Sequence, residues 1–191
     1  MTLLYAYVLA HEKFPGKTFL AFYLFFTMLF NGGLVPTYIM YTRYLHMKNT
    51  IPALIIPGLL MSAFNVILMK NYYTNNIPAS LLESARIDGC GEFKTFNKIV
   101  TPILKPAFAV QIIFTFVTNW NNYFMPRLIL TSKSKYTIPL VLNAMRYAGP
   151  QEKDVGMFSL YIVLAILPVV IVYLCLSKFI IRGVALGSVK G

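Results

Sequence analysis

Long uncharged, mostly apolar runs alternate along the chain with short segments that carry charges. The runs are bounded by Lys17 and Arg43, by Lys48 and Lys70, by Lys105 and Arg127, and by Asp154 and Lys178. A helix needs about 20 predominantly apolar residues to cross the hydrocarbon core of a bilayer, and each run reaches that length. The pattern therefore predicts transmembrane helices over residues 18–42, 49–69, 106–127 and 155–177.

The first apolar run, residues 2–10, is too short to cross a bilayer as a helix. No basic segment precedes it and no small-residue cleavage site follows it, so a signal peptide is not favoured. We expect it to form the last turns of a helix whose beginning is missing. The predicted fold is thus an all-α polytopic membrane protein, with about four full spans plus the end of another.

Glycine and proline residues interrupt the predicted spans. They are Gly32, Gly33, Pro36, Pro52, Pro57, Gly58, Pro126 and Pro168. Membrane helices tolerate such residues where neighbouring helices satisfy the freed backbone groups. We therefore expect kinked helices packed in a bundle, with Pro126 ending the third span.

The composition agrees with this class. Hydrophobic residues make up 58% of the 191 residues and charged residues only 12%, which is too apolar for a soluble domain. The net charge of +11 could indicate nucleic-acid binding, but the basic residues are scattered between apolar runs. No nucleic acid is expected as a partner.

The chain also lacks the residue patterns of several functional classes. No Asp, Glu, Lys or Arg lies in the middle of a predicted span, whereas proton-coupled carriers usually depend on ionisable residues there. Cys90 and Cys175 have no histidine or second cysteine at metal-ligand spacing. With no candidate nucleophile or general base, we expect no catalytic residue, no metal and no cofactor bound by this chain, and an energy source on another protein.

The segment between the second and third spans, residues 76–104, has the pattern of an amphipathic helical hairpin. Apolar or small residues recur at spacings of three and four: Leu82, Ala85, Gly89, Phe93, Phe96 and Val100. Gly89 and Gly91 are expected to divide the segment into two short helices. Such a hairpin can lie on the membrane, pack under its own bundle or dock into a partner, and periodicity alone leaves these alternatives open.

A motif in this segment narrows the choice. Glu83, Ser84 and Ala85, then Gly89, then Ile99 and Pro102 resemble the loop of importer-type ABC permeases, whose pattern is E-A-A, three residues, G, nine residues, I-x-L-P. Ser84 and Thr101 depart from that pattern. Further resemblance to maltose-permease-type carbohydrate permeases, particularly their oligosaccharide branch, lies in GGLVPTY at 32–38, SAFNVILMKNYY at 62–73 and GVALGSVKG at 183–191.

The resemblance implies a type I permease fold in the bacterial cytoplasmic membrane. Members normally have about six spans, so the resemblance implies that the N-terminal helices are absent from this sequence. It implies that residues 76–104 form a cytoplasmic coupling loop that receives motion from an ATPase. The implied coupling residues are Glu83, Ala85, Asp88, Gly89, Ile99 and Pro102.

The same resemblance implies partners and further sites. A second homologous permease, two ATP-binding-cassette ATPases and an extracellular solute-binding protein would act with the chain among membrane lipids, with ATP used by the partner. The cytoplasmic tail, residues 178–191, would reach the ATPase interface through Gly187 and Lys190, although a disordered tail is the alternative. The outer loop, residues 131–154, would face the binding protein or serve as an ordinary solvated connection. Basic residues favour this orientation only weakly.

Polar residues within the spans are candidates for the substrate path. Trp120 lies among Asn119, Asn121 and Asn122, and an aromatic ring beside amides suits a sugar. Interfacial anchoring of Trp120 and bonding of the amides to neighbouring helices is the alternative. Asn65 is either a path residue or a contact between helices.

The predicted function is import of a sugar or oligosaccharide by alternating access, as the permease subunit of an ABC importer. A secondary carrier or channel that needs no ATPase is the alternative from another class. A membrane scaffold is a third. The sequence does not discriminate between sugars as substrates.

Overall fold

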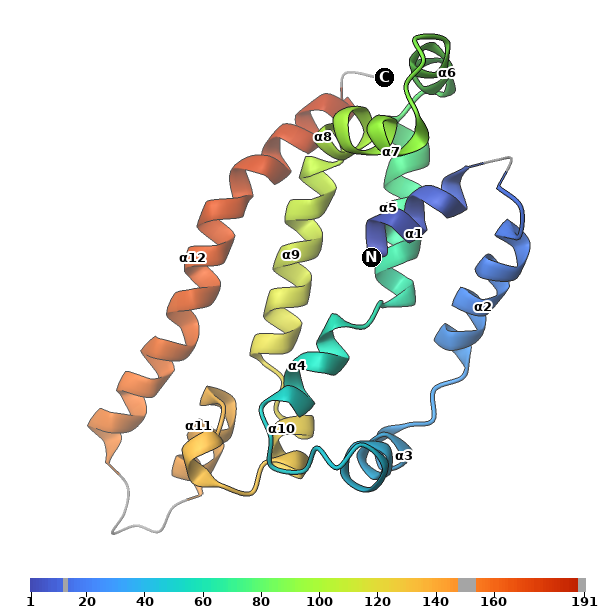
Figure 1. Cartoon of the computed structure of the whole chain (residues 1–191). Helices are drawn as coiled ribbons and strands as arrows, with labels where there is room; N and C mark the ends of the chain where they lie inside the picture. The colour runs from blue at the N-terminus through green and yellow to red at the C-terminus, as the bar shows by residue number, and fades with distance from the viewer. Residues whose placement is uncertain (12–13, 148–153, 189–191) are drawn as a thin grey trace. The chain divides into compact units, whose positions relative to one another are not determined.

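The computed structural model describes residues 1–11, 14–147 and 154–188, and side chains as far as residue 179. Every regular element in these residues is a helix (Figure 1). The elements are α1 Thr2–Ala10, α2 Lys17–Leu29, α3 Leu34–Ile39, the π-helix η1 Met40–Tyr44, α4 Pro52–Leu59, α5 Ala63–Asn76, α6 Ala79–Ile87, α7 Glu92–Thr95, the π-helix η2 Phe96–Val100, α8 Thr101–Ile103, α9 Lys105–Trp120, α10 Phe124–Ile129, the 3-10 helix η3 Lys133–Lys135, α11 Ile138–Arg146 and α12 Val155–Ser188.

The chain forms two compact units. The first comprises Met1–Asn31, Met61–Ile112 and Ser177–Gly191, and the second comprises Gly32–Leu60 and Ile113–Leu176. Each unit is built from segments far apart in the sequence, because the chain enters and leaves it more than once. The two units are therefore described separately.

The core of the first unit lies where α1, α2, α5 and the helices after α7 meet. Its buried side chains are Ala6, Tyr7, Leu9, Leu24, Val66, Met69, Tyr73, Ile77, Phe96, Val100, Leu104 and Ala107. Helix α1 packs chiefly along α5, with α2 beside both. The nine-residue helix α1 is thus held in place by its packing against the longer helix α5.

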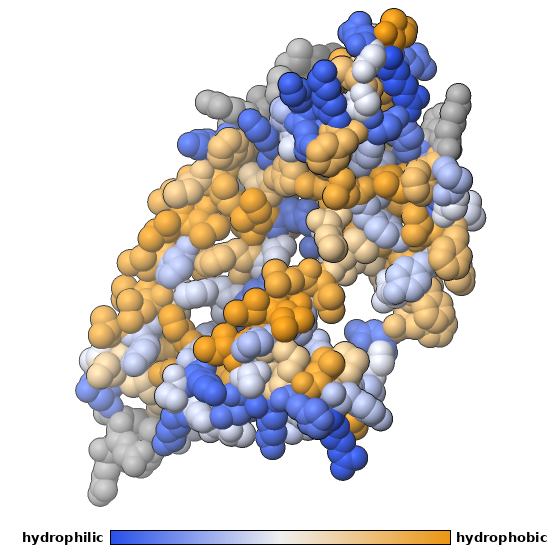
Figure 2. Space-filling model, in the orientation of Figure 1, coloured by the Kyte–Doolittle hydropathy of each residue, from blue (hydrophilic) through white to orange (hydrophobic). Residues whose placement is uncertain are grey.

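The core of the second unit is smaller. Tyr41, Ala53 and Ile129 are buried together, with Met47, Leu54 and Met125 packed against them. These residues bring α4 and α10 next to the segment around η1. In contrast, α12 leaves most of its apolar side chains exposed, such as Leu174 at 64% (Figure 2). An exposed apolar helix of this kind is typical of contact with lipid or with another membrane helix.

Two helical stretches are long and apolar enough to cross a membrane, Pro52–Asn76 and Val155–Phe179. Two further stretches qualify only if helices separated by a short break count as one span: Lys17–Leu29 with Leu34–Tyr44, and Glu92–Ile103 with Lys105–Ile129. The described residues therefore hold two candidate spans, or up to four. All four predicted spans overlap one of these stretches.

The helices are more interrupted than the charge-free runs predict. The run over 18–42 is broken after Leu29, and Gly33 there has a φ of 83°. The run over 49–69 is broken after Leu59, two residues beyond Pro57, and its second helix continues to Asn76. Pro57 lies inside α4, and the break follows it where Leu60 adopts an extended conformation with a ψ of 150°. Pro168, by contrast, lies within an uninterrupted α12.

One expectation at the later spans was wrong. Pro126 does not end the third span, because α9 already ends at Trp120 and Pro126 is buried inside α10. The segment 131–154 contains the nine-residue helix α11. The start of the predicted tail is also helical, since α12 continues to Ser188.

Candidate functional site

Helix α6 carries the first half of the motif and ends in a specific cap. It follows Pro78 and its last turn closes through two bonds: the Cys90 N–H donates to the Ala85 carbonyl at 2.9 Å, and the Gly89 N–H to the Arg86 carbonyl at 3.0 Å. Gly89 has a φ of 73°, the left-handed conformation that this cap requires. Glycine adopts it without a steric penalty, so the motif glycine ends the helix.

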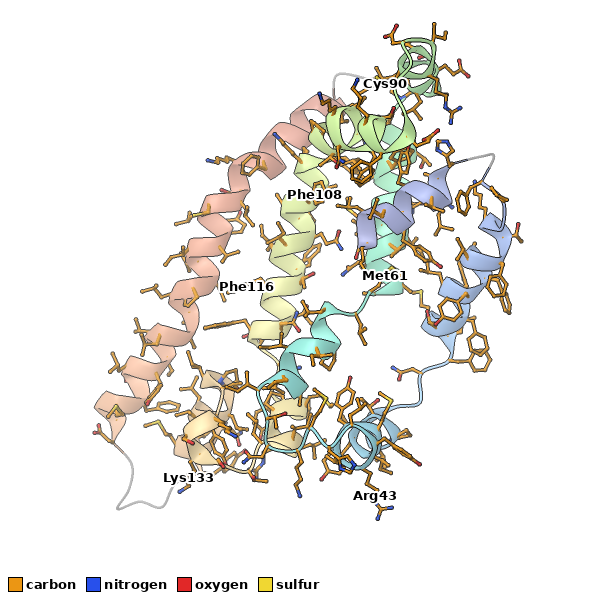
Figure 3. All side chains as sticks on the ribbon, viewed as in Figure 1. Arg43, Met61, Cys90, Phe108, Phe116 and Lys133 are labelled. Atoms are coloured by element: carbon orange, nitrogen blue, oxygen red, sulfur yellow. The ribbon has the colours of Figure 1, made fainter. Side chains whose placement is uncertain are left out.

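The second half of the segment begins immediately after this cap. Gly91 has a φ of −66° and precedes α7, which runs into η2 and α8. The predicted division into two helical pieces at the two glycines is confirmed. Cys90 lies at the junction (Figure 3).

The predicted apolar stripe is only partly correct. Ala85, Phe96 and Val100 are buried and Leu82 is half-buried, but the side chain of Phe93 is 74% exposed. The left-handed turn at Gly89 and the extended Gly91 reset the helical phase, so residues of α7 do not continue the face of α6. Ile87 is also exposed, at 86%.

The motif residues differ in exposure. Ala85 is buried at 4%, whereas Glu83, Asp88 and Gly89 are exposed. In the second half, Ile99 is half-buried and Pro102 is exposed. A Cβ placed on Gly89 meets no atom within 4 Å. The surface of α6 that carries the charged motif residues is therefore uncovered within the described chain, and polar side chains dominate it (Figure 2).

A polar cluster joins this segment to α1. The Tyr7 hydroxyl donates to the Glu92 carboxylate at 2.6 Å, and Arg86 donates to the same carboxylate at 3.0 Å. Arg86 also bonds His11, the residue that follows α1. The hydrogen bond from Tyr7 is the largest cause that holds the pKa of Glu92 below its ordinary value, and Arg86 adds to it. Glu92 is therefore ionised at neutral pH.

A hollow of about 310 Å³ lies beside the cluster. It is lined by Ala10, His11, Tyr73, Thr74, Ile77, Ala79, Leu82, Glu83 and Arg86. It separates much of α6 from the ends of α1 and α5. No group of three or more His, Cys, Asp or Glu side chains that could hold a metal occurs in the described residues.

Comparison with known proteins decides the family. A family model described as binding-protein-dependent transport system inner membrane component matches residues 4–186. The chain belongs to this family of transport permeases. The permease is therefore a helical, multi-pass component of a bacterial inner membrane, with the type I permease fold.

Individual relatives agree with this assignment. The permease is 37% identical over 203 residues to the polygalacturonan/rhamnogalacturonan transport system permease protein YtcP of Bacillus subtilis, across 98% of this chain and 69% of the relative. It is 37% identical to the arabinooligosaccharides transport system permease protein AraQ of the same organism, across 77% of this chain and 51% of the relative.

A solved structure is also similar. A bacterial ABC transporter involved in the import of the acidic polysaccharide alginate matches with a TM-score of 0.76 and 29% identity, over 93% of this chain and 68% of that chain. The permease thus spans about half to seven tenths of the length of these relatives.

The candidate path residues in the second unit are largely engaged with the protein. The indole N–H of Trp120 donates to the Ala165 carbonyl of α12 at 2.9 Å, and its ring stacks on Phe116 with centroids 5.5 Å apart. The amides of Asn119 and Asn121 donate to carbonyls one turn earlier in α9. The bond of Trp120 favours helix packing, whereas those of Asn119 and Asn121 stay within one stretch of chain and favour neither alternative for the amides. Asn122 is half-buried, as is Asn65 in the first unit.

Asn49 is an important residue that the sequence analysis missed. Its side-chain oxygen accepts from the Thr131 and Ser132 N–H groups at 3.1 Å, and its amide donates to the Ser132 hydroxyl at 2.8 Å. Its own N–H donates to the Ile129 carbonyl, and its carbonyl accepts from Lys135 at 2.6 Å. Asn49 has a φ of 56°, which asparagine adopts more readily than most residues. The sequence signal that could have indicated this turn was Asn49 itself, because it stands between the polar residues Lys48 and Thr50.

The second unit carries several exposed basic side chains, one of which bonds Asn49. They are Arg43, Lys48, Arg127, Lys133, Lys135 and Arg146. Arg43 and Lys133 lie at the same end of the unit (Figure 3). Asp154 is the only acidic residue in the described part of this unit. Of the tail residues, Gly187 lies on the helical backbone of α12 and Lys190 lies outside the described residues.

Proposed function

We propose that the permease imports a sugar or oligosaccharide across the bacterial cytoplasmic membrane, with α6 as the coupling helix that docks on an ATP-binding-cassette ATPase. The observation that carries this proposal is the exposure of Glu83 on the short helix α6, and of Asp88 and Gly89 directly after it, while Arg86 of the same helix bonds His11 and Glu92. A helix that is exposed to a partner and also bonded to its own unit can pass a movement of the partner to the membrane helices.

The proposal includes the partners and the mechanism. A second homologous permease, two ATPases and an extracellular solute-binding protein complete the transporter, and the ATPases use the ATP. Closure of the ATPases moves the coupling helices and opens the path to the outside, and hydrolysis resets it. Ala85, Ile99 and Pro102 shape the coupling segment, while Gly187 and Lys190 lie toward the ATPase side.

The proposed topology follows from the coupling segment. With residues 76–104 and 178–191 in the cytoplasm and spans over 18–42, 49–69, 106–127 and 155–177, the segment 131–154 lies outside. The exposed basic side chains of the second unit then lie on the outer side, where membrane proteins usually carry fewer cations. Cations at that position attract anionic solutes and therefore raise the local concentration of these solutes.

We therefore propose a uronate-containing oligosaccharide as the substrate. The named cargo of two similar proteins, polygalacturonan/rhamnogalacturonan and alginate, supports an anionic sugar. Uptake of labelled oligogalacturonide and labelled maltodextrin in a strain with and without the permease gene tests the function. Loss of oligogalacturonide uptake is expected. Unchanged uptake of both sugars would contradict the transport role, and loss of maltodextrin uptake alone would contradict the anionic substrate.

A further inference from the structure

Helix α6 has few attachments to the rest of the first unit. Ala85 is its only buried side chain. The hollow of about 310 Å³ lies between α6 and the ends of α1 and α5. Apolar packing of α6 therefore comes mainly from Ala85 and the half-buried Leu82, and its N-terminus joins α5 through the buried Ile77 and through Pro78.

The chain connection after α6 is also weak as a mechanical link. Residues 88–91 contain two glycines, and one of them holds a left-handed turn. Glycine restricts the backbone less than any other residue. The cap bonds hold Gly89 and Cys90 to α6, so backbone rotation at Gly91 would take up part of any movement of α6 that passed only through this connection.

Arg86 supplies a direct link across this gap. Its guanidinium bonds His11 at the end of α1 and the Glu92 carboxylate at the start of α7. His11 is 3.5 Å from the same carboxylate. One side chain of α6 therefore contacts both neighbouring elements.

Tyr7 anchors the cluster in the core. The Tyr7 residue is only 8% exposed, and its ring lies against Phe96 and Tyr73 with centroids 5.3 and 5.7 Å apart. Its hydroxyl then reaches Glu92 at 2.6 Å. The side chains of Arg86 and Glu92 are 47% and 57% exposed, and an ion pair of this kind is weak by itself. The buried tyrosine fixes the carboxylate, and the carboxylate fixes the arginine.

We propose that Tyr7, Glu92 and Arg86 are positioning residues that transmit movement of the coupling helix α6 to α1 and, through the packing of α1, to α5. This inference rests on the proposed function of α6. The cluster joins α6 to its own unit through Arg86, whereas docking is assigned to the exposed Glu83, Asp88 and Gly89. Its loss should therefore leave ATPase binding intact and lower the transport obtained per ATP.

Tyr7→Phe in the complete transporter tests this directly, because phenylalanine keeps the packed ring and loses only the hydroxyl. Tyr5→Phe is a matched control: it is the same change in the same helix, and its hydroxyl bonds the Leu20 carbonyl at 3.0 Å instead of the coupling segment. The readouts in proteoliposomes are the amount of ATPase that co-purifies, the rate of ATP hydrolysis, and import of labelled oligogalacturonide or maltodextrin, whichever the wild type accepts.

For Tyr7→Phe we expect import per ATP to fall about fivefold with co-purified ATPase unchanged, since a hydrogen bond to a charged group is lost. Tyr5→Phe should match the wild type. Import per ATP by the double variant Tyr7→Phe with Glu92→Ala should equal that of Glu92→Ala alone, because both changes remove the same hydrogen bond. Additive losses, or a Tyr7→Phe protein with wild-type import per ATP, would overturn the inference.

The two proposals fail in different ways. If no ATPase co-purifies with the wild type, the coupling function fails and this inference fails with it. If the ATPase co-purifies and the wild type imports sugar, but Tyr7→Phe and Tyr5→Phe behave alike, only the positioning role of the cluster is wrong.

Discussion

The hydroxyl of Tyr7 donates a 2.6 Å hydrogen bond to the carboxylate of Glu92, 85 residues away in the sequence. This bond joins the first helix of the chain to the start of α7. It also makes the coupling segment sensitive to the charge of a single carboxyl group. The hydrogen bond from Tyr7 is the main cause of the lowered pKa of Glu92.

This relationship predicts a pH dependence with a definite sign. The folded pKa of Glu92 lies below its ordinary value of 4.5, so ionised Glu92 stabilises the folded state above that value. The stabilisation is lost as the pH falls through the folded pKa. Thermal unfolding of the purified permease should therefore show a steeper decline in Tm below about pH 4.5 for the wild type than for Glu92→Gln. Identical pH profiles would contradict this role of the carboxylate.

Gly89 should be far less replaceable than Gly91. Gly89→Val places a β-branched residue at a φ of 73°, which costs about 1–2 kcal/mol, and adds bulk at the exposed end of α6. Gly91→Val is the matched control, because Gly91 has a φ of −66° that any residue adopts, and a Cβ there meets no atom within 4 Å. We expect sugar uptake to be abolished by the first change, with the protein still in the membrane, and retained after the second. Equal uptake by the two variants would contradict the docking role of Gly89.

Trp120 should behave as a packing residue. Trp120→Phe keeps an aromatic ring beside Phe116 and loses the bond to the Ala165 carbonyl, so stability should fall by about 1 kcal/mol. The KM for the transported sugar should not change. A raised KM with unchanged thermal stability would instead support a sugar-binding platform.

Asn49 should contribute strongly to the stability of the second unit. Asn49→Ala removes the side-chain bonds to residues 131 and 132 and places alanine at a φ of 56°, for a combined cost of about 2–3 kcal/mol. Asn49→Gly loses the same bonds without the conformational penalty, so it should be about 1 kcal/mol less destabilising. Thermal unfolding in detergent measures both. A glycine variant no more stable than the alanine variant would show that the backbone conformation is unimportant.

Local features of the fold were predictable from the sequence. Each charge-free run overlaps a candidate span of the described residues, and Gly89 and Gly91 identified the break between α6 and α7. The spacing of apolar residues failed to predict the exposure of Phe93. This residue lies beyond the left-handed turn at Gly89, so it does not continue the buried face of α6. Local rules also failed at Pro126, which lies in the first turn of α10, where a missing N–H costs no helical hydrogen bond.

The contacts that define the site could not be predicted in this way. Tyr7, Arg86 and Glu92 carry no pattern that links them, because their proximity depends on α1 packing against α5. The same holds for Asn49 and Ser132, which are 83 residues apart. A motif can indicate which surface meets a partner, whereas the attachment behind that surface is a property of the tertiary structure.

Purification of the intact permease from membranes tests the central claim most directly. If α6 is a coupling helix, ATP-binding-cassette ATPase subunits should co-purify with the wild type and hydrolyse ATP. A charge reversal at the exposed Glu83 (Glu83→Lys) should reduce the co-purified ATPase without removing the permease from the membrane. A permease that purifies without any ATPase and still drives sugar uptake would contradict the account.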